Sequence, residues 1–68
     1  MPKLSLKAAR VNAGLSQKKA AELLDVSNKT LWSWENGKSF PNADKIVSIC
    51  NLYGVQYDHL DFLPKNSL

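Results

Sequence analysis

Three polar side chains in a short segment could all face the same partner. Asn28, Lys29 and Ser33 are separated by one and four residues, which places them on one side of a helix. A carboxamide donates and accepts hydrogen bonds, an ammonium group donates three, and a hydroxyl does either. This set suits recognition of a polar surface by hydrogen bonding. No nucleophile–base pair, carboxylate pair or glycine-rich phosphate loop accompanies it, so the sequence predicts a binding protein and not an enzyme.

Two short helical patterns surround these residues and would position them. Residues 16–37 read SQKKAAELLDVSNKTLWSWENG, in which three turn-like residues, 25–27, separate the patterns. Ala21 is small at the point where the two helices would cross. This layout is that of a DNA-binding helix-turn-helix, whose second helix presents its N-terminal residues to the major groove. The alternative is an ordinary solvated helix face. The apolar positions are Ala20, Leu24, Val26, Leu31 and Trp34.

The rest of the chain predicts a compact all-α domain of five helices and no sheet. The expected helices span residues 6–13, 17–24, 28–36, 43–53 and 57–60. Pro64 cannot continue a helix, so residues 1–63 are predicted to form one domain and residues 64–68 a short tail. Ser5, Ser16, Ser27 and Asn42 are the expected helix caps. The core is expected from Leu6, Ala9, Leu15, Ala20, Leu24, Val26, Leu31, Trp34, Ile46, Ile49, Cys50, Leu52, Tyr53, Val55 and Leu60.

Composition and charge narrow the possible functions. The 68 residues carry a net charge of +3, and residues 1–38 contribute +4 while residues 39–68 contribute −1. The basic half therefore contains the helix-turn-helix pattern, as a phosphate-binding surface would require. One cysteine, Cys50, and one histidine, His59, allow no disulfide and no cysteine/histidine zinc site. No cofactor, metal or small-molecule ligand is indicated. No membrane span or signal peptide is predicted, and the expected location is cytoplasmic.

The chain resembles the helix-turn-helix regulators of the phage repressor and Cro type, which have a lambda-repressor-like DNA-binding domain. The segments LKAARVNAGLSQKKAAELLDVS, TLWSWENGKSFPN and ADKIVSICNLYGVQYDHL carry the resemblance over roughly residues 4–62. It implies a five-helix domain with its helix-turn-helix at residues 17–36, and an ion pair between Arg10 and Glu35. Two departures stand out. Asp25 occupies a turn position that is usually glycine, and Trp32 a position that is usually small or polar.

The third expected helix would then read bases. Asn28 could pair with adenine and Lys29 with guanine, whereas Ser33 could reach a base or a phosphate. Thr30 could contact a base at the edge of this face or support the Ser27 cap. Trp32 is expected to be partly buried with an edge toward DNA, where it could contact a thymine methyl group or a sugar. Alternatively, it could orient the helix or anchor a protein partner.

A second group of residues is expected to hold the DNA backbone. The backbone N–H groups at the start of the second helix attract a phosphate, and the amide of Gln17 could donate to the same oxygen. Arg10 could offer phosphate an N–H that Glu35 does not use. Such contacts set orientation and affinity but not sequence preference. The predicted phosphate contacts are Arg10, Gln17, Lys18, Asn36, Lys38 and Ser39.

The predicted function is a transcriptional regulator, specifically a Cro-like repressor that binds double-stranded DNA at a palindromic operator as a homodimer. The apolar C-terminal stretch supplies the predicted dimer surface, although Phe62 and Leu63 could instead fold back onto their own domain. The alternative is a protein-interaction module on the same fold, such as an antitoxin or anti-repressor, without sequence-specific DNA binding. The predicted dimer interface consists of Tyr53, Val55, Tyr57, Phe62 and Leu63.

Overall fold

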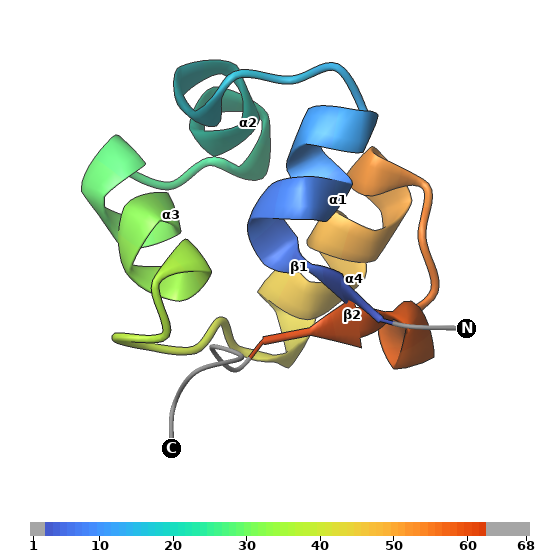
Figure 1. Ribbon diagram of the computed structural model, residues 1–68. Helices are drawn as coiled ribbons and strands as arrows, with labels where there is room; N and C mark the ends of the chain where they lie inside the picture. The colour runs from blue at the N-terminus through green and yellow to red at the C-terminus, as the bar shows by residue number, and fades with distance from the viewer. Residues whose placement is uncertain (1–2, 63–68) are drawn as a thin grey trace.

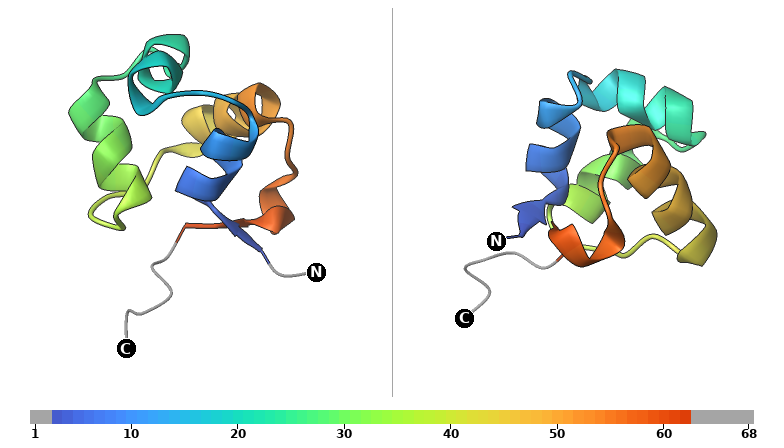
Figure 2. Two further views of the ribbon diagram at one scale, coloured as in Figure 1. Left: turned by 45° about the horizontal axis from the view of Figure 1, so that its top comes forward. Right: turned by 90° about the vertical axis from the view of Figure 1, so that its right-hand side faces the viewer.

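The computed structural model describes residues 3–62, which form four α-helices and one short pair of strands (Figure 1). Helices α2 and α3 lie together on one side of α1 and α4 (Figure 2). The strand pair lies at the N-terminal end of α1. The expected tail, residues 64–68, lies outside the described residues. The elements are β1 (Leu4–Ser5), α1 (Leu6–Asn12), α2 (Gln17–Leu24), α3 (Asn28–Glu35), α4 (Ala43–Tyr53), a 3-10 turn (Tyr57–His59) and β2 (Leu60–Asp61).

The four predicted helix caps are confirmed. Ser5, Ser16 and Ser27 each accept a hydrogen bond at Oγ from the backbone N–H three residues later, at 3.0 Å. Asn42 caps α4 in the same way, with Oδ1 2.9 Å from the backbone nitrogen of Lys45. Each cap satisfies one of the N–H groups that a helix leaves unpaired at its start. The predicted starts of all four α-helices are therefore correct, while α1 and α3 end one residue earlier than predicted.

The prediction of five helices without a sheet is wrong at both ends of the chain. The fifth expected helix is a single 3-10 turn, because Leu60 takes an extended conformation at φ −103° and ψ 140°. Residues 60–61 instead pair in parallel with residues 4–5, with Leu4 opposite Leu60. Strands of two residues are too short to produce a period-2 pattern, and their pairing joins opposite ends of the domain. Local sequence patterns therefore could not reveal them.

The core lies between α1, α4 and the helix-turn-helix. Ile46, expected in the core, is half-buried, because it lines a surface groove and not the domain centre. Ala21 on α2 is only 3% exposed, as expected for a small residue where this helix packs closely against its neighbours. The half-buried residues packed against the core include Leu15, Val26, Cys50, Leu52 and Val55. The buried apolar residues are Leu6, Ala9, Ala20, Ala21, Leu24, Leu31, Trp34, Ile49, Tyr53 and Leu60.

The turn between α2 and α3 passes through Asp25 in a left-handed conformation. Its φ of 59° and ψ of 46° fall where glycine is common and where aspartate is tolerated better than most residues. Lys45 on α4 donates a hydrogen bond from Nζ to the backbone oxygen of Leu24, at 2.7 Å. This bond satisfies a carbonyl at the end of α2 and ties the turn to α4. Lys45 therefore helps α4 to hold the turn that sets the angle between α2 and α3.

Tyr53 combines a buried position with a hydroxyl that no residue of the range 3–62 binds. Burial, together with the negative charge of Glu35, raises the pKa of Tyr53 to about 12, and the positive charge of Arg10 opposes the rise. Because the phenol ionises near pH 10 in the unfolded chain and at about 12 in the folded chain, its titration does not affect stability below pH 10 and lowers the stability as the pH rises from 10 to 12.

We therefore expect Tyr53→Phe to be at least as stable as the wild type at pH 7, because it removes an unpaired buried hydroxyl. Between pH 10 and 12 the advantage of the variant should grow by about 1 to 3 kcal/mol. Urea unfolding of both proteins across this range measures the difference in their free energies of unfolding. The titration of the lysines affects both proteins equally and cancels in this difference. A gap that stays constant with pH would contradict the assignment.

Candidate nucleic-acid interface

The exposed face of α3 carries the residues predicted to read bases. Asn28 and Lys29 are exposed in its first turn, and Ser33 is half-buried one turn further along. Thr30 is half-buried, and its Oγ1 accepts a hydrogen bond from Ser27 Oγ at 2.9 Å. Its hydroxyl thus takes part in the cap of α3, which was the alternative to a base contact. Leu31 and Trp34 face the core, so the opposite side of α3 is anchored.

A chain of hydrogen bonds connects α1, α2 and α3. Arg10 Nε lies 2.7 Å from Glu35 Oε2, and Nη2 lies 3.3 Å from Oε1. Gln17 donates from Nε2 to Glu35 Oε1 at 3.0 Å. Asn28 in turn donates from Nδ2 to Gln17 Oε1 at 2.8 Å. The buried ion pair is therefore joined to an exposed side chain at the start of α3, which fixes the direction in which that side chain points.

The Arg10–Glu35 pair is buried on both sides, with side chains only 9% and 3% exposed. The remaining donor of Arg10, Nη1, bonds to the backbone oxygen of Leu15 at 2.8 Å. The guanidinium is thus engaged within the protein at all three nitrogens, and little of it can reach an external phosphate. Its position favours a structural role in joining α1 to α3.

The start of α2 opens onto a depression that we call the polar hollow, which lies between α1, α2 and α3. Gln17 is half-buried here, and one N–H of its Nε2 is used by Glu35. Asn36 is exposed and donates from Nδ2 to the backbone oxygen of Trp32 at 2.8 Å. Three helices thus contribute to one polar concavity beside the exposed face of α3. The polar hollow is lined by Lys7, Arg10, Ser16, Gln17, Trp32, Glu35 and Asn36.

Lys7 is a residue of this hollow that the sequence analysis missed. It precedes Arg10 by three residues, so the two share one side of α1. That spacing was a usable signal, because the resemblance already placed Arg10 next to the end of α3. Since Arg10 and Glu35 neutralise each other, Lys7 gives the hollow an excess of positive charge.

The other predicted phosphate contacts lie around this region as exposed side chains. Lys18, Lys38 and Ser39 are exposed, as is the base-reading candidate Lys29. Among residues 3–62, none of these side chains forms a hydrogen bond or an ion pair. They are therefore available to a ligand, unlike Lys19, which lies 4.0 Å from Glu22.

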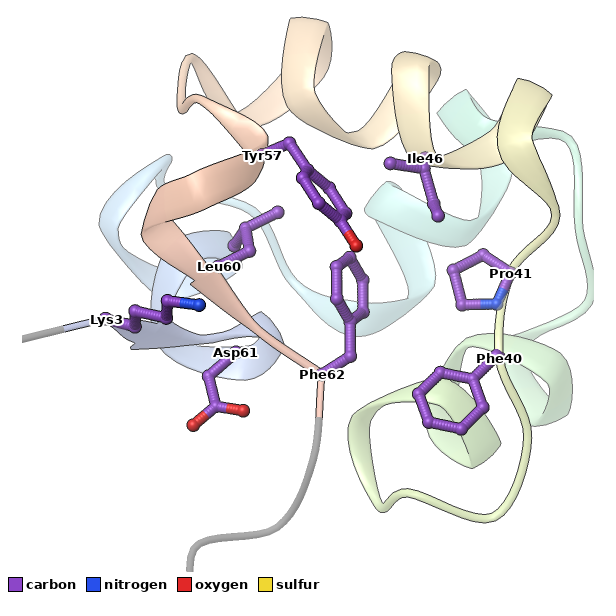
Figure 3. Close-up of a pocket in the computed structure, with 8 residues that line it drawn as sticks. All are labelled: Lys3, Phe40, Pro41, Ile46, Tyr57, Leu60, Asp61 and Phe62. Carbon is purple, nitrogen blue, oxygen red and sulfur yellow. The ribbon is translucent and has the colours of Figure 1, made fainter.

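The structure places the predicted dimer residues in different environments. Tyr53 is only 6% exposed, so its assignment to a dimer surface is wrong: it packs in the core as part of the α4 stripe. Val55 is half-buried against the core. Tyr57 and Phe62 line an apolar groove, with ring centroids 6.0 Å apart, whereas Leu63 lies outside the described residues (Figure 3). The apolar groove is lined by Lys3, Phe40, Pro41, Ile46, Tyr57, Leu60, Asp61 and Phe62.

Comparison with known families identifies the class of domain that these features define. The model of the helix-turn-helix family matches residues 6–60, so the chain belongs to this family. The match confirms the expected resemblance to repressor-type helix-turn-helix domains. Within residues 3–62, no helix is long and apolar enough to cross a membrane.

Two regulators are similar to this chain over 55 residues. One is the HTH-type transcriptional regulator ImmR of Bacillus subtilis (strain 168), at 42% identity. The other is the HTH-type transcriptional activator BcrR of Enterococcus faecalis, at 34% identity. Each match covers 81% of this chain but only 43% and 27% of the relatives, so the chain spans less than half the length of either. No solved structure matches the chain significantly.

Proposed function

We propose that the chain is a transcriptional regulator that binds duplex DNA sequence-specifically, with α3 in the major groove. The observation that carries the proposal is the hydrogen-bond chain that ends at Asn28. Its Nδ2 gives one N–H to Gln17, so Oδ1 and the second N–H are left to face the two adjacent groups that adenine presents in the groove. Lys29 would bind guanine beside it, and Ser33 and Thr30 would complete the base-reading face.

The backbone contacts of this proposal surround α3. Gln17 and the unpaired N–H groups at the start of α2 would bind one phosphate, with Lys18 beside them. Lys38 and Ser39 would bind a second phosphate at the far end of α3, and Asn36 would lie between the two. Arg10 would contribute through Glu35, because its guanidinium is buried and each of its three nitrogens already donates a hydrogen bond within the protein. These contacts fix the register of the domain on DNA.

Two copies would bind a palindromic operator in this proposal. Half-sites on one face of the duplex are about 34 Å apart, which requires a partner for each domain. The apolar groove supports this arrangement, because Phe40 and Tyr57 on its rim are each 60% exposed. Patches of this kind are typical of protein–protein contacts. The function would be Cro-like repression in the cytoplasm, since occupying an operator is enough to block a promoter.

Salt dependence tests the DNA part of the proposal. We expect the logarithm of the duplex association constant to fall linearly with the logarithm of the salt concentration, because bound lysines release counterions from phosphates. Fluorescence anisotropy with a labelled duplex measures this slope, and Lys18→Ala together with Lys38→Ala should reduce it by about one per lysine. If the chain binds no duplex but binds a protein partner with an affinity that does not change with salt, the alternative of an interaction module is supported.

A further inference from the structure

Trp32 differs sharply from the other tryptophan of α3. Its side chain is 47% exposed, whereas Trp34 is 6% exposed in the core. No residue of the range 3–62 accepts a hydrogen bond from its indole N–H. The indole lies at the edge of the polar hollow and is partly buried, as the sequence predicted. A large aromatic group with an unused donor is thus held beside a polar depression.

The hollow next to Trp32 is suited to an anion. Lys7 carries a positive charge there, and the side chains of Gln17 and Asn36 place amide groups around it. The Glu35 carboxylate adds little repulsion, because Arg10 and Gln17 both bond to it. An aromatic surface adjoining an anion site matches a deoxyribose with its phosphate, which presents an apolar ring next to a negative charge.

The position of Trp32 along α3 distinguishes a backbone contact from a base contact. Asn28 lies in the first turn, and Trp32 follows four residues later, about 6 Å further along the helix axis. When the N-terminal residues of a recognition helix enter the major groove, the later turns rise toward the edge of the groove. At that edge a side chain meets sugars and phosphates before it meets bases.

We propose that Trp32 binds the DNA backbone and does not read a base. Its ring packs against a deoxyribose, and Nε1–H donates to an oxygen of the phosphate held in the polar hollow. This assignment rests on the proposed function, since it takes α3 to lie in the major groove. The sequence placed Trp32 among the base-reading candidates, with a thymine methyl group or a sugar as its partner, and this assignment takes the sugar.

The proposal has two measurable consequences. The contact is made to a unit that every nucleotide contains, so it strengthens binding to all duplex sequences equally. An indole is uncharged, so its contact does not depend on counterion release and leaves the salt slope unchanged. Lysine contacts would change the slope, and a base contact would change the sequence preference. Trp32 can therefore be separated from both.

The test compares Trp32→Ala and Trp32→Phe with the wild type on two labelled duplexes of about 30 base pairs, one preferred and one scrambled. Trp32→Ala should weaken binding to both about tenfold, which corresponds to losing roughly 60 Å² of apolar contact. Trp32→Phe keeps a ring but loses the N–H and should weaken binding about threefold. Val47→Ala is the control, because it alters an exposed apolar residue on α4.

Thermal unfolding should be the same for all variants, because Trp32 contributes little to the core. Wild-type tryptophan emission should change on duplex binding, and Trp32→Phe should remove most of that change. If Trp32→Ala binds both duplexes as well as wild type, or if it weakens only the preferred duplex, the backbone assignment is wrong. If the wild type binds neither duplex, the proposed function itself fails, which is a different result.

Discussion

Replacing Arg10 by methionine is expected to lower the free energy of unfolding by about 3 to 5 kcal/mol. The change leaves the Glu35 carboxylate, 3% exposed, without its charged partner. It also frees the backbone oxygen of Leu15, which Arg10 binds at 2.8 Å. A domain of this size has a total stability of only about 5 kcal/mol, so the variant should be largely unfolded at 37 °C. Urea unfolding followed by circular dichroism measures the effect.

A matched control and a double variant separate the ion pair from general effects of losing a charge. Lys19→Met removes a cation that lies 4.0 Å from Glu22 with both side chains more than half exposed, and it should change the stability by about 1 kcal/mol or less. Arg10→Met combined with Glu35→Leu removes both buried charges and should recover part of the lost stability. Unchanged stability of Arg10→Met alone would show that the pair does not hold α1 to α3.

The second large effect concerns Asn28 and Lys29. Asn28→Ala should reduce discrimination at one base position in each half-site by about 1 to 3 kcal/mol, and Lys29→Ala should do so at a neighbouring position. The Asn28 side chain is already held by Gln17 at 2.8 Å, so little conformational entropy is lost when it meets a base. Competition binding with single-base variants of the preferred duplex measures both losses.

Asn51→Ala is the matched control for these variants, because Asn51 is an exposed asparagine on α4, away from the helix-turn-helix. It should bind every duplex as the wild type does. If Asn28→Ala binds the preferred duplex and all of its single-base variants more weakly than the wild type by the same factor, Asn28 contacts the backbone and does not read a base. That result would require a different register of α3 in the groove.

Local sequence signals predicted most of the helical framework. Ser5, Ser16, Ser27 and Asn42 were recognisable caps because each is followed directly by a helical apolar stripe, and each bonds as expected. The stripe on α4 also correctly placed Tyr53 in the core. The prediction that Tyr53 also belongs to a dimer surface was wrong. It followed from counting the apolar residues near the end of the chain, and that count does not show which of them the fold buries.

Features that depend on distant contacts were beyond the sequence. The strand pair joins Leu4 to Leu60, and two-residue strands have no pattern of their own. The Arg10–Glu35 contact came only from the family resemblance. The bonds of Gln17 to Glu35 and Asn28 depend on side-chain directions that only the packed helices determine.

The central claim is that α3 reads a DNA sequence as part of a dimer. Selection from a random duplex library, with sequencing of the bound DNA at two salt concentrations, tests it directly. We predict a palindromic sequence with half-sites about one helical turn apart, enriched at both concentrations. Weak binding without sequence enrichment, which disappears at the higher salt concentration, would contradict the claim.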